Sequence, residues 1–147
     1  MDTAPPIPVT IRPARPEDHP RCAEIFVAAQ HAAFSWQRVR PVAADYYASI
    51  EGEEVWVAER DGLLVGLCSI YRPENFVHSL YLDPSWRGRG IGGLLLTRAL
   101  TRIGRPARLK TDVENKAAQR FYERLGWWAE STGVGEQGAF ILYRTDR

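Results

Sequence analysis

The sequence predicts one α/β chain built on a mixed sheet of about six or seven strands with about four helices, antiparallel along its first strands and parallel further on. Two β-rich runs flank the dipeptide Asp61-Gly62, which is typical of a type I′ hairpin. A later strand, residues 76–82, runs into a glycine-rich stretch and then into a helix. Strand 108–113 follows that helix, so the two strands are expected to be parallel neighbours.

Length and composition are those of an ordinary globular protein. The 147 residues are expected to form a single domain, with 45% apolar and 25% charged residues. A net charge of +1 gives no field to attract nucleic acid or an acidic membrane, and we expect neither as a partner. There is no apolar run of ~20 residues and no signal-peptide pattern. Two isolated cysteines argue against disulfides and zinc, so a reduced, metal-free, cytoplasmic protein is expected.

The first part of the chain carries the weaker signals. Residues 1–8 are proline-rich and are expected to form a loose arm. Residues 9–12 form a short strand, and Pro16 opens a helix whose apolar residues recur at helical spacing. Residues 31–41 have no clear periodicity. Residues 42–50 are expected to form a short second helix.

The second part is better defined by its turn and cap residues. Gly104 ends the helix that begins at Ile91. Asn115 is a good N-cap for the last helix, and Gly126 suits its C-terminal end. The elements expected here are hairpin strands 54–60 and 63–71, strand 76–82, helix 91–103, strand 108–113, helix 116–125, and a final strand pair, 127–131 and 138–144.

The glycine-rich stretch is expected to bind a phosphate group. Gly88, Gly90 and Gly92 remove side chains from the backbone where a helix begins, so the unpaired N–H groups of that helix can reach a ligand. The helix dipole favours an anion at this end, and Arg87 and Arg89 add positive charge. The sequence therefore predicts a phosphate or pyrophosphate site.

Other interpretations of the same glycines stay open. Gly88, Gly90 and Gly93 fit the G-x-G-x-x-G of dinucleotide-binding domains, and Asp112 follows roughly 20 residues later, although that motif normally opens its domain. A P-loop is excluded, because no Gly-Lys-Ser/Thr follows the glycines. A glycine-rich turn without any ligand is the plainest alternative.

Two motifs resemble those of a known enzyme family. Arg-x-x-Gly-x-Gly at positions 87–92, directly after strand 76–82, resembles the acetyl-CoA signature of the GNAT (GCN5-related) N-acetyltransferase superfamily. Residues 115–127 resemble the Asn-x-x-Ala-x-x-Phe-Tyr-x-x-Leu-Gly-Phe/Trp motif of the same superfamily. The resemblance extends over residues 9–143, although its specific part is confined to the region of these motifs.

The resemblance implies an N-acetyltransferase that moves the acetyl group of acetyl-CoA, its co-substrate, onto a primary amine in a ternary complex. It also implies that strands 76–82 and 108–113 splay apart, so that the pantetheine arm can pair with the edge of the first strand. Asn115 has a competing role as a helix cap. The residues assigned to the cofactor are Leu80, Tyr81, Leu82, Arg87, Gly88, Arg89, Gly90, Ile91, Gly92 and Asn115.

The resemblance also suggests catalytic residues. Tyr122 matches the position of the general acid of the superfamily, and a phenol with a pKa near ~10 can protonate a leaving thiolate. The alternative is an aromatic side chain that only packs on the sheet. Many relatives carry a glutamate base at the position of Phe76, and His78, on the same strand face, is the candidate base here. A purely structural histidine is the alternative. Weaker options for the base are Glu53, Glu74 and water.

The acceptor is expected to be a primary amine on a small molecule or a peptide. Phe34, Trp36 and Tyr46 are either the wall of its pocket or buried packing. A non-catalytic acyl-CoA-binding module is the alternative function, supported by the missing glutamate at Phe76 and opposed by the retained tyrosine. A homodimer is a further expectation, by analogy with relatives.

Overall fold

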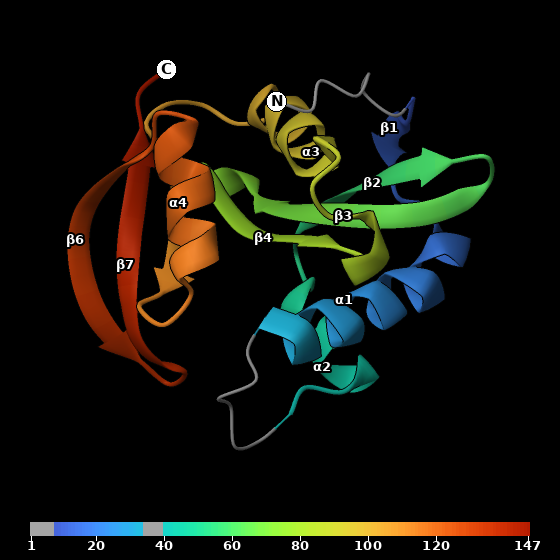
Figure 1. Cartoon of the computed structure of the whole chain (residues 1–147). Coiled ribbons are helices and arrows are strands. Elements are labelled where there is room, and N and C mark those ends of the chain that lie inside the picture. The colour runs from blue at the N-terminus through green and yellow to red at the C-terminus, as the bar shows by residue number, and fades with distance from the viewer. Residues whose placement is uncertain (1–7, 34–39) are drawn as a thin grey trace.

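The computed structural model describes residues 8–33 and 40–147, which form a seven-stranded sheet in the order β1-β2-β3-β4-β5-β7-β6 (Figure 1). Within this sheet β4 and β5 are parallel and the other neighbours are antiparallel, which confirms the predicted α/β class. The strands are β1 (Thr10–Pro13), β2 (Glu54–Arg60), β3 (Leu63–Tyr71), β4 (Phe76–Leu82), β5 (Ala107–Asp112), β6 (Trp128–Gly135) and β7 (Gly138–Thr145). The α-helices are α1 (His19–Ala33), α2 (Ala43–Ser49), α3 (Ile91–Leu100) and α4 (Lys116–Arg124).

Helices cover both faces of the sheet. Figure 1 shows α3 over one face, α1 and α2 over the opposite face, and α4 beside β7. The side chains between α3 and the sheet include Ile91, Leu95, Leu96, Ala99, Val65, Cys68 and Ile70. Those on the α1 side include Cys22, Ile25, Phe26, Tyr46, Val55, Val57 and Leu67. No helix in the described ranges is long and apolar enough to span a membrane.

The turn between β2 and β3 has the predicted type I′ conformation. Asp61 has a φ of 50° and Gly62 a φ of 81°, so both central residues are left-handed. That conformation matches the twist of the flanking strands and is adopted most readily by an Asp-Gly pair. Both strands of this hairpin have the predicted bounds.

Other boundaries differ from the prediction. Pro16 opens a short 3-10 turn, and α1 begins only at His19. α3 ends at Leu100, because the next turn is closed by three-residue rather than four-residue hydrogen bonds. β6 is longer than predicted. Gly133 makes this possible, because a Cβ at that position would lie 2.5 Å from the Phe140 ring of β7.

β4 and β5 are paired over only a short length. Phe76 and Val77 are aligned with Arg108 and Leu109, and beyond these two pairs the strands are no longer joined. In Figure 1, α4 stands beside β7, the strand that pairs with β5. The predicted splay of the parallel pair is therefore confirmed.

Candidate functional site

The turn between β4 and α3 forms an open cradle of main chain. Gly88 and Gly90 have φ values of 74° and 81°, and Gly90 is the N-cap of α3. A Cβ added at either glycine would meet no heavy atom within 4 Å. A hydrogen bond from the Leu94 N–H to the Gly90 carbonyl closes the first turn of α3, so the N–H groups before Leu94 have no partner within the helix. Free N–H groups on an open surface suit an anion.

Positive charge lies beside this cradle. Arg87 and Arg89 are exposed. The Arg89 guanidinium lies 5.1 Å from the centre of the Trp86 ring, and the Arg60 guanidinium lies 5.7 Å from the same ring. Stacking of this kind stabilises a cation on an aromatic face. Trp86 therefore helps to keep two guanidinium groups close to the N-terminus of α3.

The splayed part of β4 meets α3 and α4 next to the cradle. Leu80 and Leu82 face the α3 side of the sheet and Tyr81 faces α1, as strand alternation requires. A Cβ at Gly92 would lie 3.5 Å from the Phe121 ring and 3.7 Å from Leu82. Leu82 of β4, Gly92 of α3 and Phe121 of α4 therefore lie close together at the edge of the split.

α4 presents Tyr122 to this region. Asn115 begins the helix, and its Oδ1 accepts a hydrogen bond from the Ala118 N–H at 3.1 Å, which is the predicted N-cap. The Tyr122 side chain is buried, and its ring lies edge-on to Trp127 with 5.9 Å between ring centres. Burial raises the pKa of the Tyr122 hydroxyl well above its usual value. Burial therefore favours the neutral, protonated form of this hydroxyl.

His78 is the extra residue of a β-bulge in β4. Ser69 and Ile70 are adjacent in β3, yet they pair with Ser79 and Val77, so His78 has no partner across the ladder. A bulge changes the direction in which a side chain leaves the strand. The bulge therefore frees His78 from the regular alternation.

The His78 imidazole contacts Glu53, which lies in the turn before β2. Its Nδ1 is 2.6 Å from Glu53 Oε2, and its ring centre is 6.5 Å from that of Phe76. Hydrogen bonding to the Glu53 carboxylate raises the pKa of His78, although burial acts in the opposite direction. The Glu53 side chain is 9% exposed, and its Oε1 is buried without a partner among the described residues. His78 is therefore already engaged by a carboxylate.

Comparison with known proteins gives this arrangement a family. The model of the acetyltransferase (GNAT) family matches residues 15–127, which include the cradle, the split and Tyr122. The chain belongs to the GNAT acetyltransferase family. The acetyl-CoA signature and the α4 motif lie in the matched range, so the sequence prediction of this superfamily is confirmed.

Individual GNAT proteins resemble different portions of the chain. Mycothiol acetyltransferase from Streptomyces coelicolor is 35% identical over 99 residues, or 62% of this chain and 30% of that protein. The matches span only 24% to 30% of the first curated relatives. A GCN5-related N-acetyltransferase structure from Rhodopseudomonas palustris has a TM-score of 0.78 at 22% identity, covering 100% of this chain and 99% of that one. YncA from Salmonella typhimurium, solved with acetyl-CoA, has a TM-score of 0.71 at 23% identity, covering 95% and 94%.

Only one of the three residues predicted to line the acceptor pocket lies in the part of the chain that the structure describes. Phe34 and Trp36 lie outside the described residues. The Tyr46 side chain is fully buried against α1, which corresponds to the buried-packing alternative. Its hydroxyl is 2.7 Å from His19 Nδ1, and its ring centre is 6.0 Å from that of Phe26. Tyr46 holds α2 on α1 and has no surface left for a substrate.

Two polar side chains that the sequence did not link to a GNAT site lie near the split. Gln30, in α1, donates a hydrogen bond from Nε2 to the Tyr81 hydroxyl at 2.8 Å, and nothing in its sequence context signals this contact. Asp112 is the last residue of β5, and the sequence suggested a role for it only in the dinucleotide-binding interpretation. Burial raises its pKa. Strand alternation was the signal that could have found it, because it puts Asp112 on the same face as Lys110.

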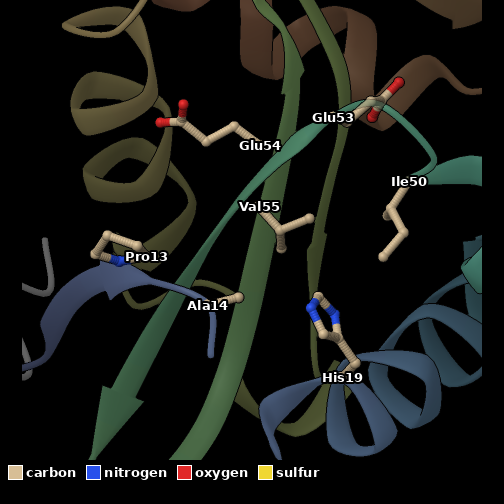
Figure 2. A pocket seen from close by; sticks show the side chains of 7 residues that line it. All are labelled: Pro13, Ala14, His19, Ile50, Glu53, Glu54 and Val55. Atoms are coloured by element: carbon tan, nitrogen blue, oxygen red, sulfur yellow. The ribbon is translucent and has the colours of Figure 1, made fainter. Parts of the chain in front are cut away.

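A hollow of about 280 Å³ lies apart from the split, between β1, the start of α1 and the start of β2 (Figure 2). Figure 2 shows His19 and Ile50 extending into it from α1 and from the end of α2. The Glu54 carboxylate extends toward α3 instead, where Arg102 donates to it at 2.9 Å. No cradle residue lines this hollow, and it shares only Glu53 with the surroundings of His78. Its lining is Pro13, Ala14, His19, Ile50, Glu53, Glu54 and Val55.

Proposed function

We propose that this GNAT protein is an N-acetyltransferase that moves the acetyl group of acetyl-CoA onto a primary amine by direct attack in a ternary complex. The split between β4 and β5 carries the proposal, because it leaves a strand edge free beside an anion site. Cys22 and Cys68 are both buried, so neither thiol is accessible to carry the acetyl group as a covalent intermediate.

The residues present fit acetyl-CoA. Its pyrophosphate is proposed to lie on the main-chain N–H groups of Arg89–Gly92, where the open left-handed glycines leave room, with Arg87 at its edge. The pantetheine arm is proposed to pair with the free edge of β4 along Leu80–Leu82. Asn115 already caps α4 with its side chain, so its contribution is to fix the start of that helix.

Acetyl transfer forms a bond between the amine nitrogen and the acetyl carbon, breaks the carbon–sulfur bond, and releases a proton from the nitrogen. We assign the Tyr122 hydroxyl to the leaving sulfur, as the general acid of the reaction. Burial raises its pKa further above that of a thiol, which is about 8.5. We therefore propose that Tyr122 stabilises the leaving thiolate more by a hydrogen bond than by complete transfer of its proton. A main-chain N–H near Leu80 is the proposed donor to the oxyanion.

His78 is the proposed base, acting directly or through a water molecule. An ordinary primary ammonium has a pKa near ~10, so a nearby group must take its proton before attack. Contact with Glu53 raises the pKa of His78. The imidazole can therefore accept a proton only at a pH higher than an unperturbed histidine requires. The acidic limb of the rate profile is expected above the ordinary value of ~6.5.

Release of free thiol from acetyl-CoA across a panel of primary amines tests the proposal. We expect turnover by the wild type and a roughly 100-fold lower kcat in Tyr122→Phe, with coenzyme A binding intact. Tyr143→Phe is the matched control. It removes a hydroxyl that donates to Glu123 at 2.6 Å, from a ring 6.5 Å away from that of Tyr122. We expect its kcat to stay close to that of the wild type.

Two outcomes of these measurements would favour a different function. Tight coenzyme A binding without turnover across the panel favours a non-catalytic acyl-CoA-binding module, the alternative supported by Phe76 in place of a glutamate. Thermal stabilisation by NAD and none by coenzyme A would favour the dinucleotide interpretation.

A further inference from the structure

Two hydrogen-bond acceptors without donors lie on the α1 side of the split. Within the described ranges, the Asp112 carboxylate has no ion pair or hydrogen bond, since the bonds from the Asn115 N–H and from Gln119 Nε2 end on the main-chain oxygen of Asp112. The Asp112 side chain is half-buried, whereas Oε1 of Gln30 is buried and has no partner among these residues. The Nε2 atom of Gln30 donates to the Tyr81 hydroxyl, so the amide has a fixed position with one free end.

Strand geometry places Asp112 across the split from Tyr81. The last aligned pair of β4 and β5 is Val77 with Leu109, and the two side chains follow soon after it on the diverging strands. Leu109 is buried on the α3 side, so alternation turns Asp112 toward α1, as it does Tyr81. Burial raises the pKa of the Tyr81 hydroxyl, and the charge of Asp112 adds to that rise, as expected for neighbours.

The unpaired carboxylate has an energetic cost. Burial raises the pKa of Asp112, and no described group offsets the loss of hydration. Lys110 lies two residues earlier on the same strand face, but its Nζ stands over the rings of Phe140 and Phe76, at 4.6 and 6.0 Å from their centres. A charge kept partly desolvated and unpaired in this way is typical of functional sites.

We propose that Asp112 and Oε1 of Gln30 bind the ammonium group of the acceptor, which enters as a primary amine from the α1 side of the split. The inference rests on the proposed acetyl transfer. A primary ammonium offers three N–H donors, and these two side chains offer only acceptors. Binding there holds the nitrogen beside β4, where the thioester is proposed to lie. One proton must then leave the nitrogen to His78 or water before attack.

A pair of charge-removing substitutions tests this site. Asp112→Asn keeps the shape of the side chain, whereas Glu114→Gln removes the same charge from an exposed position in the next turn. Asp112→Asn is expected to raise the KM of the acetylated amine roughly 10- to 100-fold and to leave the KM of acetyl-CoA unchanged. Glu114→Gln is expected to change neither.

Stability separates a binding role from a structural one. Removal of a desolvated charge should leave the Tm of Asp112→Asn equal to or above that of the wild type, even as the KM for the amine rises. A fall in Tm together with a rise in both KM values would overturn the inference, because it would mean that Asp112 supports the fold. Equal KM values for Asp112→Asn and Glu114→Gln would also overturn it.

A binding measurement makes failure of this site distinguishable from failure of the proposed function. The side-chain carboxyl of Asp112 is titrated by carbon-13 NMR in the presence of ethylammonium chloride or of tetramethylammonium chloride, which has no N–H donor. Ethylammonium should lower the pKa of Asp112, and tetramethylammonium should not. The same response to both salts, or no response, overturns the ammonium site even in an active enzyme. A specific ethylammonium response without any acetyl transfer overturns only the proposed function.

Discussion

The substitution Gly90→Ala is expected to have two separate effects, a loss of stability from the strained backbone and a loss of coenzyme A binding at the cradle. Gly90 has a φ of 81°, and a Cβ there would meet no heavy atom within 4 Å, so the cost arises in the backbone alone. A left-handed L-residue costs roughly 1–2 kcal/mol. The stiffer unfolded chain offsets about 0.4–1 kcal/mol of this cost. Gly90→Ala should therefore lose about 1 kcal/mol of unfolding free energy, which lowers Tm by about 2–4 °C for a chain of this size.

Two other glycines provide matched controls for that substitution. Gly52, in the turn before β2, has a φ of 75° and equally open surroundings. Gly52→Ala should therefore lower Tm by a similar amount far from the cradle. Gly93 lies inside α3 without a positive φ, and alanine there should stabilise the helix by about 0.5–1 kcal/mol. Differential scanning calorimetry should thus place Gly93→Ala above the wild type and the other two variants below it.

Added coenzyme A then distinguishes Gly90 from Gly52. A ligand that binds only the native state raises Tm, and a methyl group at the N-cap of α3 stands in the way of the anion. The rise should shrink in Gly90→Ala and persist in Gly52→Ala. Equal Tm values for Gly90→Ala and Gly93→Ala would refute the left-handed N-cap. An undiminished rise with coenzyme A in Gly90→Ala would refute the cradle.

Three further outcomes are expected. Asn115→Ala should lower the unfolding free energy by about 1 kcal/mol and Asn115→Asp should not, in thermal melts, because only alanine removes the oxygen that caps α4. Two arginine partners lower the pKa of Glu130 from 4.5 to about 2, so its stabilisation is complete above 4.5 and is lost as the pH falls through about 2. As the pH falls from 4.5 to about 2, the Tm of Glu130→Gln should therefore fall less than the Tm of the wild type. Burial raises the pKa of Cys22 to about 11 and that of Cys68 to about 12, so a thiol reagent near pH ~8 should label neither until the protein unfolds.

Features that depend on neighbouring residues were predictable from the sequence. Asp61-Gly62 requires little beyond its own dihedral preferences to make the hairpin turn, and Asn115 needs only the start of its own helix to act as a cap. The left-handed Gly90 at the N-cap of α3 belongs to the same kind of local chemistry. These features were therefore found with almost correct boundaries.

Several features that depend on side-chain contacts between distant elements were not predicted from the sequence. His78 meets Glu53 only because a bulge in β4 redirects its side chain, and a sequence without its register does not reveal a bulge. Gln30 meets Tyr81 across 51 positions of the chain. The sequence left open whether Tyr46 lines a pocket or is buried, and the packing of α2 on α1 buries it. In each case tertiary packing decided the outcome.

The short alignment of β4 with β5 has a consequence for attempts to stabilise this protein. Each ladder hydrogen bond that closure of the two strands would add contributes about 0.5–1.5 kcal/mol, so selection for thermostability alone would favour closing the sheet. The resulting variant would melt later, but it would leave no strand edge for a cofactor. Engineering for heat resistance should therefore spare the residues that keep β4 and β5 apart and target the surface helices, where a gain in stability is not exchanged for activity.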